Sequence, residues 1–183
     1  MRAFISLNIS RETAAVIKEF QDTVKHSLGY ADSHNFRWET PDKFHITIFF
    51  IGDTEETEIE NIKNCLADIK EEGIGTINLE LGRLSGFPDI KRPNVLFVEL
   101  KDNENKLQRL NKFIKDCVKS LGFEHSGKYH AHITLGRVKR NCRIKMPTDL
   151  SLAGSFEIRN ISLMKSTLNK EGAIHECLFN AEL

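Results

Sequence analysis

Three segments of the chain carry apolar residues at every third or fourth position, which is the spacing of an amphipathic α-helix. Polar residues that are able to cap a helix precede each of these stripes. We therefore expect three helices that pack against a common core. The stripes comprise Ile17, Phe20, Val24 and Leu28; Ile59, Ile62, Leu66 and Ile69; and Leu107, Leu110, Ile114, Cys117 and Leu121.

The expected ends of the helices follow from the residues around the stripes. Ser10 is the expected N-cap of the first helix, and residues 53–56 supply a capping box with an acidic first turn for the second. The third helix is expected to begin after Asp102 or Asn103 and to stop at Gly122.

Seven further segments, each bounded by Gly, Pro, Asn or Asp, have the composition of β-strands. Together with the helices they predict an α+β fold, in which helices pack on antiparallel sheets. The expected strands are residues 2–8, 44–51, 74–84, 94–100, 129–138, 154–164 and 175–181.

A short motif occurs twice in the chain. His45-Ile-Thr recurs 87 residues later as His132-Ile-Thr, and an expected strand and helix precede each copy. Two such β-α-β units predict two pseudo-symmetric lobes of antiparallel sheet around a central cleft. We expect residues 1–183 to form one bilobal domain.

The composition describes an ordinary globular chain. Its 183 residues are 40% hydrophobic and 28% charged, and 26 basic residues balance 26 acidic ones, so net charge predicts neither nucleic-acid nor membrane binding. No apolar run exceeds four residues, which excludes a transmembrane helix, and no secretory signal is expected at the N-terminus.

The four cysteines are widely spaced and form no Cys-x-x-Cys pair, which excludes a zinc ribbon and a thioredoxin-type motif. Cys65 and Cys117 fall near the apolar stripes, so we expect them to be reduced thiols in the core. A cytoplasmic location follows from that expectation.

The repeated motif places the same chemistry on two strands. Alternate residues of a strand share a face, so His45 and Thr47 point one way, and His132 and Thr134 do the same in the second copy. If the lobes are symmetric, two imidazoles and two hydroxyls converge on one cleft. One imidazole can accept a proton and the other donate one, while the hydroxyls donate hydrogen bonds to phosphate oxygens.

A metal site is the alternative interpretation of these histidines. His130 and His132 share a strand face and could imitate two metal ligands. No third ligand stands at a recognisable spacing, and threonines are poor zinc ligands. We therefore expect no metal and no other cofactor.

The paired motifs resemble the H-x-T-x signatures of the 2H phosphoesterase superfamily, and most of all its RNA 2′,3′-cyclic phosphodiesterases, historically described as 2′-5′ RNA ligases. The resemblance extends over residues 1–5, 37–52, 86–97 and 132–137. Two departures are conservative: Ile48 replaces the more usual leucine, and Ala131 stands where the family often has proline.

The resemblance implies metal-free hydrolysis of a terminal 2′,3′-cyclic phosphate to a 2′-phosphate, with reversible 2′-5′ ligation as a further expectation. It makes His45 the proton donor to the leaving 3′ oxygen and His132 the base that activates water. Thr47 and Thr134 would hold the phosphate, and the arginine of the second motif corresponds to Arg137.

The sequence does not decide how two basic residues reach the phosphate. Strict alternation puts Arg137 on the face opposite His132, so either a bulge at Gly136 turns it back or its side chain wraps around the end of the strand. Arg92 is a second candidate for a phosphate contact, although Lys91 beside it could take the same place.

Other residues are candidates for nucleotide or RNA binding. Trp38 either stacks on a base or staples its loop to the core, and His130 is expected at the rim of the cleft. A basic run follows the second motif and is either a solvated loop or a track for an RNA backbone. The run comprises Arg137, Lys139, Arg140, Arg143 and Lys145.

Two rival functions remain open. The chain could act on a small cyclic nucleotide, such as ADP-ribose cyclic phosphate, instead of an RNA end. It could also be a non-catalytic RNA-binding module, although binding alone would not need two titrating imidazoles. The expected partner is thus RNA with a 2′,3′-cyclic phosphate end or a cyclic nucleotide, bound by a monomer without a membrane.

Overall fold

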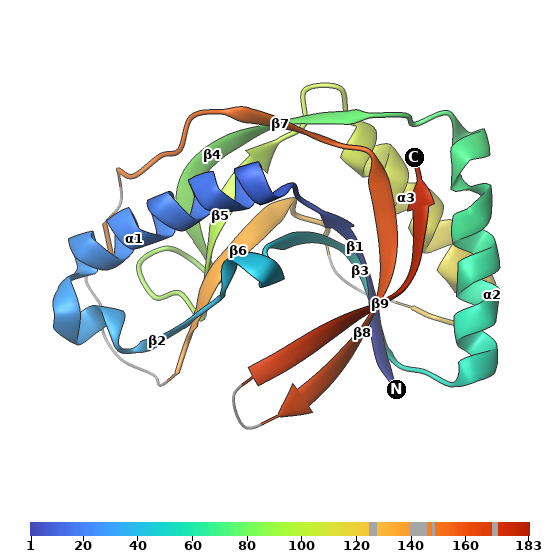
Figure 1. The fold of residues 1–183 in the computed structure, drawn as a ribbon, viewed down its shortest axis with the longest axis horizontal. Coiled ribbons are helices and arrows are strands. Elements are labelled where there is room, and N and C mark those ends of the chain that lie inside the picture. The colour runs from blue at the N-terminus through green and yellow to red at the C-terminus, as the bar shows by residue number, and fades with distance from the viewer. Residues whose placement is uncertain (125–127, 140–145, 148, 170–171) are drawn as a thin grey trace.

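The computed structural model describes residues 1–124, 128–139, 146–147, 149–169 and 172–183, and it contains two antiparallel sheets (Figure 1). The four-stranded sheet has the spatial order β3 (His45–Asp53), β1 (Arg2–Asn8), β8 (Asn160–Asn169) and β9 (Gly172–Glu182). The five-stranded sheet has the order β2 (Phe36–Trp38), β6 (His132–Val138), β5 (Val95–Lys101), β4 (Ile77–Phe87) and β7 (Ser155–Ile158).

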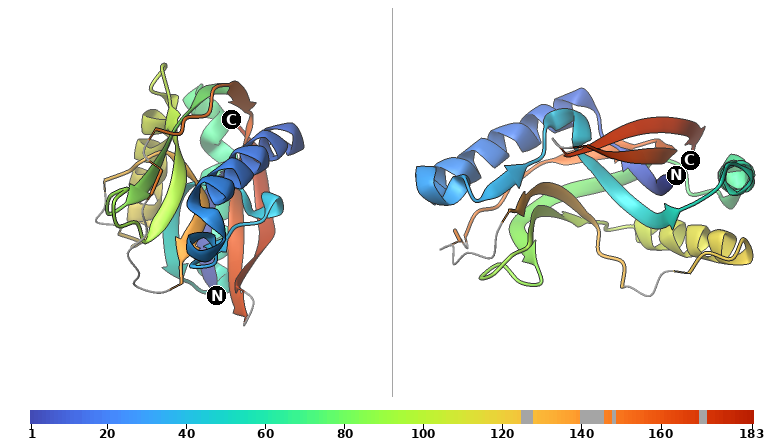
Figure 2. Two further views of the ribbon diagram at one scale, coloured as in Figure 1. Left: turned by 90° about the vertical axis from the view of Figure 1, so that its left-hand side faces the viewer. Right: turned by 90° about the horizontal axis from the view of Figure 1, so that it is seen from below.

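Three α-helices accompany the sheets within the described residues, as the apolar stripes predict. They are α1 (Arg11–Ser33), α2 (Glu56–Ala67) and α3 (Lys106–Ser120), with short 3₁₀ turns η1 (Pro41–Lys43) and η2 (Asp68–Glu72). Figure 2 shows α1 and α3 at opposite ends of the molecule. None of the helices in the described parts of the chain is both long and apolar enough to cross a membrane.

The caps of the helices agree with the sequence to within a few residues. Ser10 is the N-cap of α1, and its hydroxyl accepts a hydrogen bond from the Thr13 amide at 3.1 Å. The capping box of α2 joins Glu55 and Glu58. The Asp102 carboxylate accepts from the Leu107 amide at 2.6 Å, although the N-cap residue of α3 is Asn105.

The prediction of one strand over residues 154–164 is wrong. The chain forms β7 in the five-stranded sheet, leaves it at Arg159, and enters the four-stranded sheet as β8. The alternation of apolar residues changes phase between Ile158 and Ile161, which marks the transfer and which the prediction of a single strand overlooked. Strand β2, which has only three residues, was not predicted either.

The two units that contain the repeated motif have the same strand register. Ser6 of β1 pairs with Thr47, and Phe97 of β5 pairs with Thr134. In both pairs the register then shifts by one residue, which leaves Ile48 and Leu135 without a partner in the ladder. Each motif is therefore followed by a β-bulge at the same position.

A buried amide from the other unit's helix binds each bulge. The Gln21 side chain of α1 donates to the Leu135 carbonyl at 2.9 Å and to the Glu39 carbonyl at 2.8 Å. The Asn111 side chain of α3 donates to the Ile48 carbonyl at 2.9 Å. The helix of each unit thus packs against the strand pair of the other, which joins the two units.

The structure brings Cys65 and Cys117 together between α2 and α3, with their Cα atoms 6.4 Å apart. That they are reduced thiols stays a prediction. Their stripes face each other, which the spacing within each helix does not reveal. The cytoplasmic location likewise stays a prediction.

The bound bulges predict a measurable contribution of Asn111 to stability. Asn111→Leu keeps the volume of the side chain but leaves the buried Ile48 carbonyl without its donor, which costs about 1–3 kcal/mol. For a chain of this size we expect the melting temperature to fall by roughly 2–10 °C. Calorimetry of this variant beside Gln108→Leu, an exposed amide on the same helix, tests this. An Asn111→Leu protein as stable as the Gln108→Leu control would contradict it.

Candidate active site

The first motif begins at the start of β3, where the chain leaves η1. The Nδ1 atom of His45 lies 2.7 Å from the carbonyl oxygen of Lys43. Because a carbonyl only accepts, Nδ1 carries the hydrogen of the neutral ring. The other nitrogen, Nε2, lies 3.1 Å from the Thr47 hydroxyl and is left to gain or lose a proton.

The second motif repeats this arrangement on β6. The Nδ1 atom of His132 lies 2.7 Å from the carbonyl oxygen of His130, two residues before it, just as Lys43 precedes His45. The same tautomer follows, with Nε2 as the titrating nitrogen. Both motifs therefore present an imidazole that is oriented by its own backbone.

Burial governs the protonation of both rings. Together with smaller contributions from the charges of His175, His132 and Arg137, and against the Lys43 hydrogen bond, burial lowers the pKa of His45 from 6.5 to about 4. Burial also lowers the pKa of His132, with smaller contributions from His130 and Arg137 and against its own backbone hydrogen bond. The strands β3 and β6 contact each other, and Arg137 acts on both rings, so the two motifs lie close together.

The bulge in β6 determines where Arg137 points. Because the register shifts at Leu135, Arg137 returns to the face of His132 and Thr134. This agrees with the bulge alternative derived from the sequence, with Leu135 instead of Gly136 as the extra residue. The Arg137 guanidinium lies 3.6 Å from the Glu39 carboxylate and stays half exposed.

Aromatic rings line the site beside each imidazole. The Phe4 ring lies 5.2 Å from the His45 ring, measured between centroids. On the other side, Phe97 lies 4.9 Å and Phe87 5.2 Å from the His132 ring. These rings exclude water from one side of each imidazole, which accounts for the lowered pKa values.

Trp38 is held in place by a hydrogen bond and by contacts of its ring with neighbouring side chains. Its indole N–H donates to the Ser33 carbonyl at 3.0 Å, its ring lies 5.0 Å from Phe36, and the Lys25 ammonium sits 5.2 Å from the ring centroid. A Cβ atom on Gly136 would come within 3.0 Å of the same ring. These contacts favour the staple over the base-stacking alternative.

The remaining sequence candidates lie farther from the motifs or outside the description. His130 is exposed, with its ring 6.3 Å from that of His132, which fits a rim position. Arg92 is exposed in the β4–β5 connection. The Lys139 ammonium donates to the His34 carbonyl at 3.0 Å. Arg140 and the rest of the basic run, Arg143 and Lys145, lie outside the described residues.

Two residues near the motifs were missed by the sequence analysis. The ring centroid of His175 lies 5.6 Å from that of His45. Glu39 pairs with Arg137. Neither residue stands in a motif, and contacts between segments distant in the sequence bring both to the site, so no local signal could have found them.

Metal ligands do not gather in the described parts of the chain. No group of three or more histidine, cysteine, aspartate or glutamate side chains there could hold an ion. The hydroxyls of Thr47 and Thr134 and the guanidinium of Arg137, on the same strand faces as the two histidines, suit a phosphate better than a cation.

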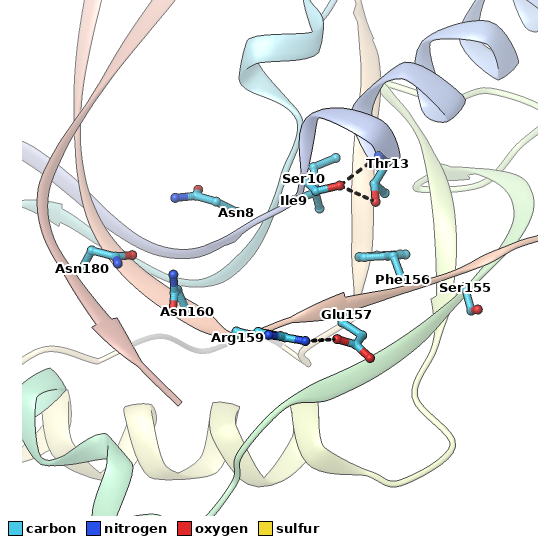
Figure 3. Close-up of a pocket in the computed structure, with 10 residues that line it drawn as sticks. All are labelled: Asn8, Ile9, Ser10, Thr13, Ser155, Phe156, Glu157, Arg159, Asn160 and Asn180. Carbon is cyan, nitrogen blue, oxygen red and sulfur yellow. Dashed lines mark hydrogen bonds and ion pairs between the residues drawn. The ribbon is translucent and has the colours of Figure 1, made fainter.

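A pocket of about 580 Å³ lies next to the site at the start of α1 (Figure 3). Its polar side chains bond to one another or to close neighbours: Ser10 to Thr13, Arg159 to Glu157, and Asn180 to Asn8 through Ser162. No histidine belongs to its lining among the described residues.

Comparison with known proteins gives a consistent family. The sequence profile of the AKAP7 2′5′ RNA ligase-like domain matches residues 3–171. The RNA 2′,3′-cyclic phosphodiesterase of Aquifex aeolicus is 33% identical over 183 residues, which are 96% of this chain and 93% of that protein. The enzyme of the same name from Aeropyrum pernix is 31% identical over 148 residues, which are 77% and 82% of the two chains.

Solved structures share the fold at lower identity. TT0787 of Thermus thermophilus superposes with a TM-score of 0.85 at 20% identity and covers 100% of this chain and 98% of its own. LigT of E. coli, in a complex with 3′-AMP, gives a TM-score of 0.78 at 17% identity over 100% and 97% of the two chains. These likenesses confirm the α+β fold with two antiparallel sheets.

The burial of His45 predicts a loss of stability in acid. The unfolded chain binds a proton to this residue below pH 6.5, whereas the folded protein does so only near pH 4. Stability should therefore fall as the pH drops between these values, by on the order of 3 kcal/mol from this residue. His45→Gln should lose less stability between pH 7 and pH 4.5 in urea titrations. The exposed His34→Gln is the control, and equal losses in both variants would refute the prediction.

Proposed function

The chain belongs to the family of the RNA 2′,3′-cyclic phosphodiesterases and 2′-5′ RNA ligase-like domains, and from this membership we propose that it hydrolyses 2′,3′-cyclic phosphate ends of RNA to 2′-phosphates. One observation carries the proposal. Two partly buried imidazoles, His45 and His132, have the same tautomer and stand on strands of the same geometry, β3 and β6, which contact each other.

The two imidazoles divide the proton transfers. His132 takes a proton from water through Nε2, and the resulting hydroxide attacks phosphorus. His45 gives a proton from Nε2 to the 3′ oxygen as its bond to phosphorus breaks. The proton count balances, because one ring gains a proton as the other loses one. The base then returns its proton to the acid through solvent before the next turnover.

Substrate binding prepares His45 for the role of acid. With a pKa of about 4, its ring is neutral at pH 7 before the substrate arrives. The cyclic phosphodiester is an anion, and an anion beside the ring favours the imidazolium, so binding raises the pKa of His45. The acid is thus charged when its target is in place.

Thr47, Thr134 and Arg137 stabilise the phosphate in this scheme. The hydroxyls stand on the same strand faces as the imidazoles and donate to non-bridging oxygens. The guanidinium of Arg137 neutralises the charge that grows in the transition state. Glu39, which pairs with Arg137 at 3.6 Å, keeps that guanidinium on the site side of β6.

The terminal nucleotide is the part of the RNA that this site contacts in our proposal. Lys139 of the basic run already binds the His34 carbonyl, which does not support a track for the RNA backbone at that residue. We also propose that the enzyme is a monomer in the cytoplasm and that it catalyses reversible 2′-5′ ligation of RNA. A preference for mononucleotides over oligonucleotides would favour the small cyclic nucleotide as the substrate.

The proposed function predicts the product and the conditions of turnover. An oligonucleotide with a 2′,3′-cyclic phosphate end should yield only the 2′-phosphate, and it should do so in excess EDTA, because side chains supply the acid, the base and the hydrogen-bond donors to the phosphate.

The variants His45→Ala and His132→Ala should each turn over about 10²- to 10⁴-fold more slowly than the parent, whereas His34→Ala should match it. Chromatography of the nucleotides identifies the product. A 3′-phosphate product, or activity that needs a divalent ion, would overturn the proposal. Binding of the oligonucleotide without any turnover would indicate an RNA-binding module.

The division of labour between the histidines can be tested with the leaving group. A phosphodiester with a good leaving group in the 3′ position needs little protonation, so it should restore turnover to His45→Ala and leave His132→Ala slow. Steady-state rates of both variants on the activated and the natural substrate measure this. Rescue of His132→Ala instead would show that the roles are exchanged, and rescue of neither would exclude acid catalysis at the leaving oxygen.

A further inference from the structure

Two arginines stand opposite each other at the edge of the five-stranded sheet. Arg37 of the edge strand β2 is the direct partner of Arg137 of β6 in the antiparallel ladder. Partners in a ladder project from the same face of a sheet, so Arg37 lies on the face that carries Arg137 and His132. Its neighbour Phe36 projects to the other face and is buried in the core.

This pairing places two like charges side by side. A guanidinium keeps its charge at every pH at which a protein is folded, and like charges opposite each other in a ladder are destabilising. The Glu39 carboxylate pairs with Arg137 at 3.6 Å, whereas no carboxylate of the described residues pairs with Arg37, which is exposed. A bound anion removes such a repulsion, and the guanidinium group is well suited to phosphate.

The Arg37 side chain extends toward the four-stranded sheet. Its guanidinium lies beside the start of β9, where a Cβ atom on Gly172 would be 4.0 Å away from it. Figure 1 shows β8 and β9 extending past the rest of their sheet, toward the side of the molecule that holds β2. Farther along β9, the ring of His175 packs against that of His45 at 5.6 Å. Three residues of a strand span about 10 Å, so the guanidinium lies along β9 from the proposed acid.

We propose that Arg37 binds a backbone phosphate of the RNA on the 5′ side of the terminal nucleotide. The proposed function, on which this inference rests, puts His45 at the leaving 3′ oxygen and therefore the terminal ribose on the His45 side of the phosphorus. The RNA chain continues from the 5′ oxygen of that ribose, away from the attacking water. Its preceding phosphates then lie on the side where the Arg37 guanidinium stands, while Arg137 holds the terminal phosphate.

A contact with a backbone phosphate distinguishes an RNA end from a mononucleotide, which has no such phosphate. It also has two signatures that a structural role of Arg37 in β2 would not produce. The contact needs a charge on the linkage between nucleotides. It also makes the affinity depend on salt, because each neutralised phosphate of a single strand changes the slope of log K against log salt concentration by about −0.7.

Isothermal titration with three ligands tests the inference. The ligands are the trinucleotide ApApA with a 2′-phosphate end, the same trinucleotide with neutral methylphosphonate linkages, and 2′-AMP. We expect Arg37→Gln to bind the charged trinucleotide about 3- to 10-fold more weakly than the parent, since one exposed charge-assisted contact is lost. Its salt dependence should become shallower by about 0.7.

The other two ligands and a second variant are the controls. The affinities of Arg37→Gln for the methylphosphonate trinucleotide and for 2′-AMP should equal those of the parent, which also shows that the site is intact. Arg109→Gln removes the same charge from an exposed position on α3. It should match the parent for all three ligands and in the salt slope.

Each other result overturns the inference. Unchanged affinity of Arg37→Gln for the charged trinucleotide would exclude the contact. Equal weakening for the charged and the neutral trinucleotide, or for 2′-AMP, would place Arg37 at a base, at the terminal phosphate or in the packing of β2. A parent that binds the trinucleotide no more tightly than 2′-AMP would favour a small cyclic nucleotide as the substrate. These titrations need no turnover, so their outcome is independent of the hydrolysis assay, which alone judges the proposed function.

Discussion

The carbonyl groups of two bulge residues fix how this molecule is assembled. Ile48 and Leu135 fall out of the strand ladders directly after the repeated motifs, and their carbonyls point into the protein where no water can reach them. A buried carbonyl without a donor is strongly disfavoured, so each requires a partner at one position. Asn111 provides it for Ile48, and Gln21 provides it for Leu135 together with the backbone N–H of Glu39. Because these amides sit on the helices of the opposite unit, two local requirements orient the two sheets.

The same backbone supports different chemistry in its two halves. Phe50 and Arg137 occupy equivalent positions, five residues after the motif histidines, yet one is an apolar ring and the other a cation. Ser6 and Phe97 are likewise equivalent in register. A symmetric scaffold thus holds two imidazoles in matched orientations, while the residues around them differ. An acid and a base need such a difference, because two identical environments would give them identical proton affinities.

The sequence predicted the elements and the paired motifs because both depend on local periodicity. The alternation of β3 and β6 determined which residues share the face of each histidine, and the repeat indicated that the two copies have one geometry. What escaped prediction depends on contacts between distant segments. The proximity of Cys65 and Cys117, the transfer of the chain at Arg159 and the approach of His175 all arise from how sheets and helices meet. The role of Gln21 does have a signal in the sequence, because it is a polar residue within the apolar stripe of the first helix.

The exchange of helices between the two units bears on how such a chain could arise. A single copy of the strand–helix–strand unit would carry its own amide on a helix that cannot reach its own bulge. It would satisfy that carbonyl only by associating with a second copy, each lending its helix to the other, as in a domain-swapped dimer. Duplication within one gene would then turn an interface between subunits into the core of a monomer. Neither half of the present chain should persist as a folded fragment.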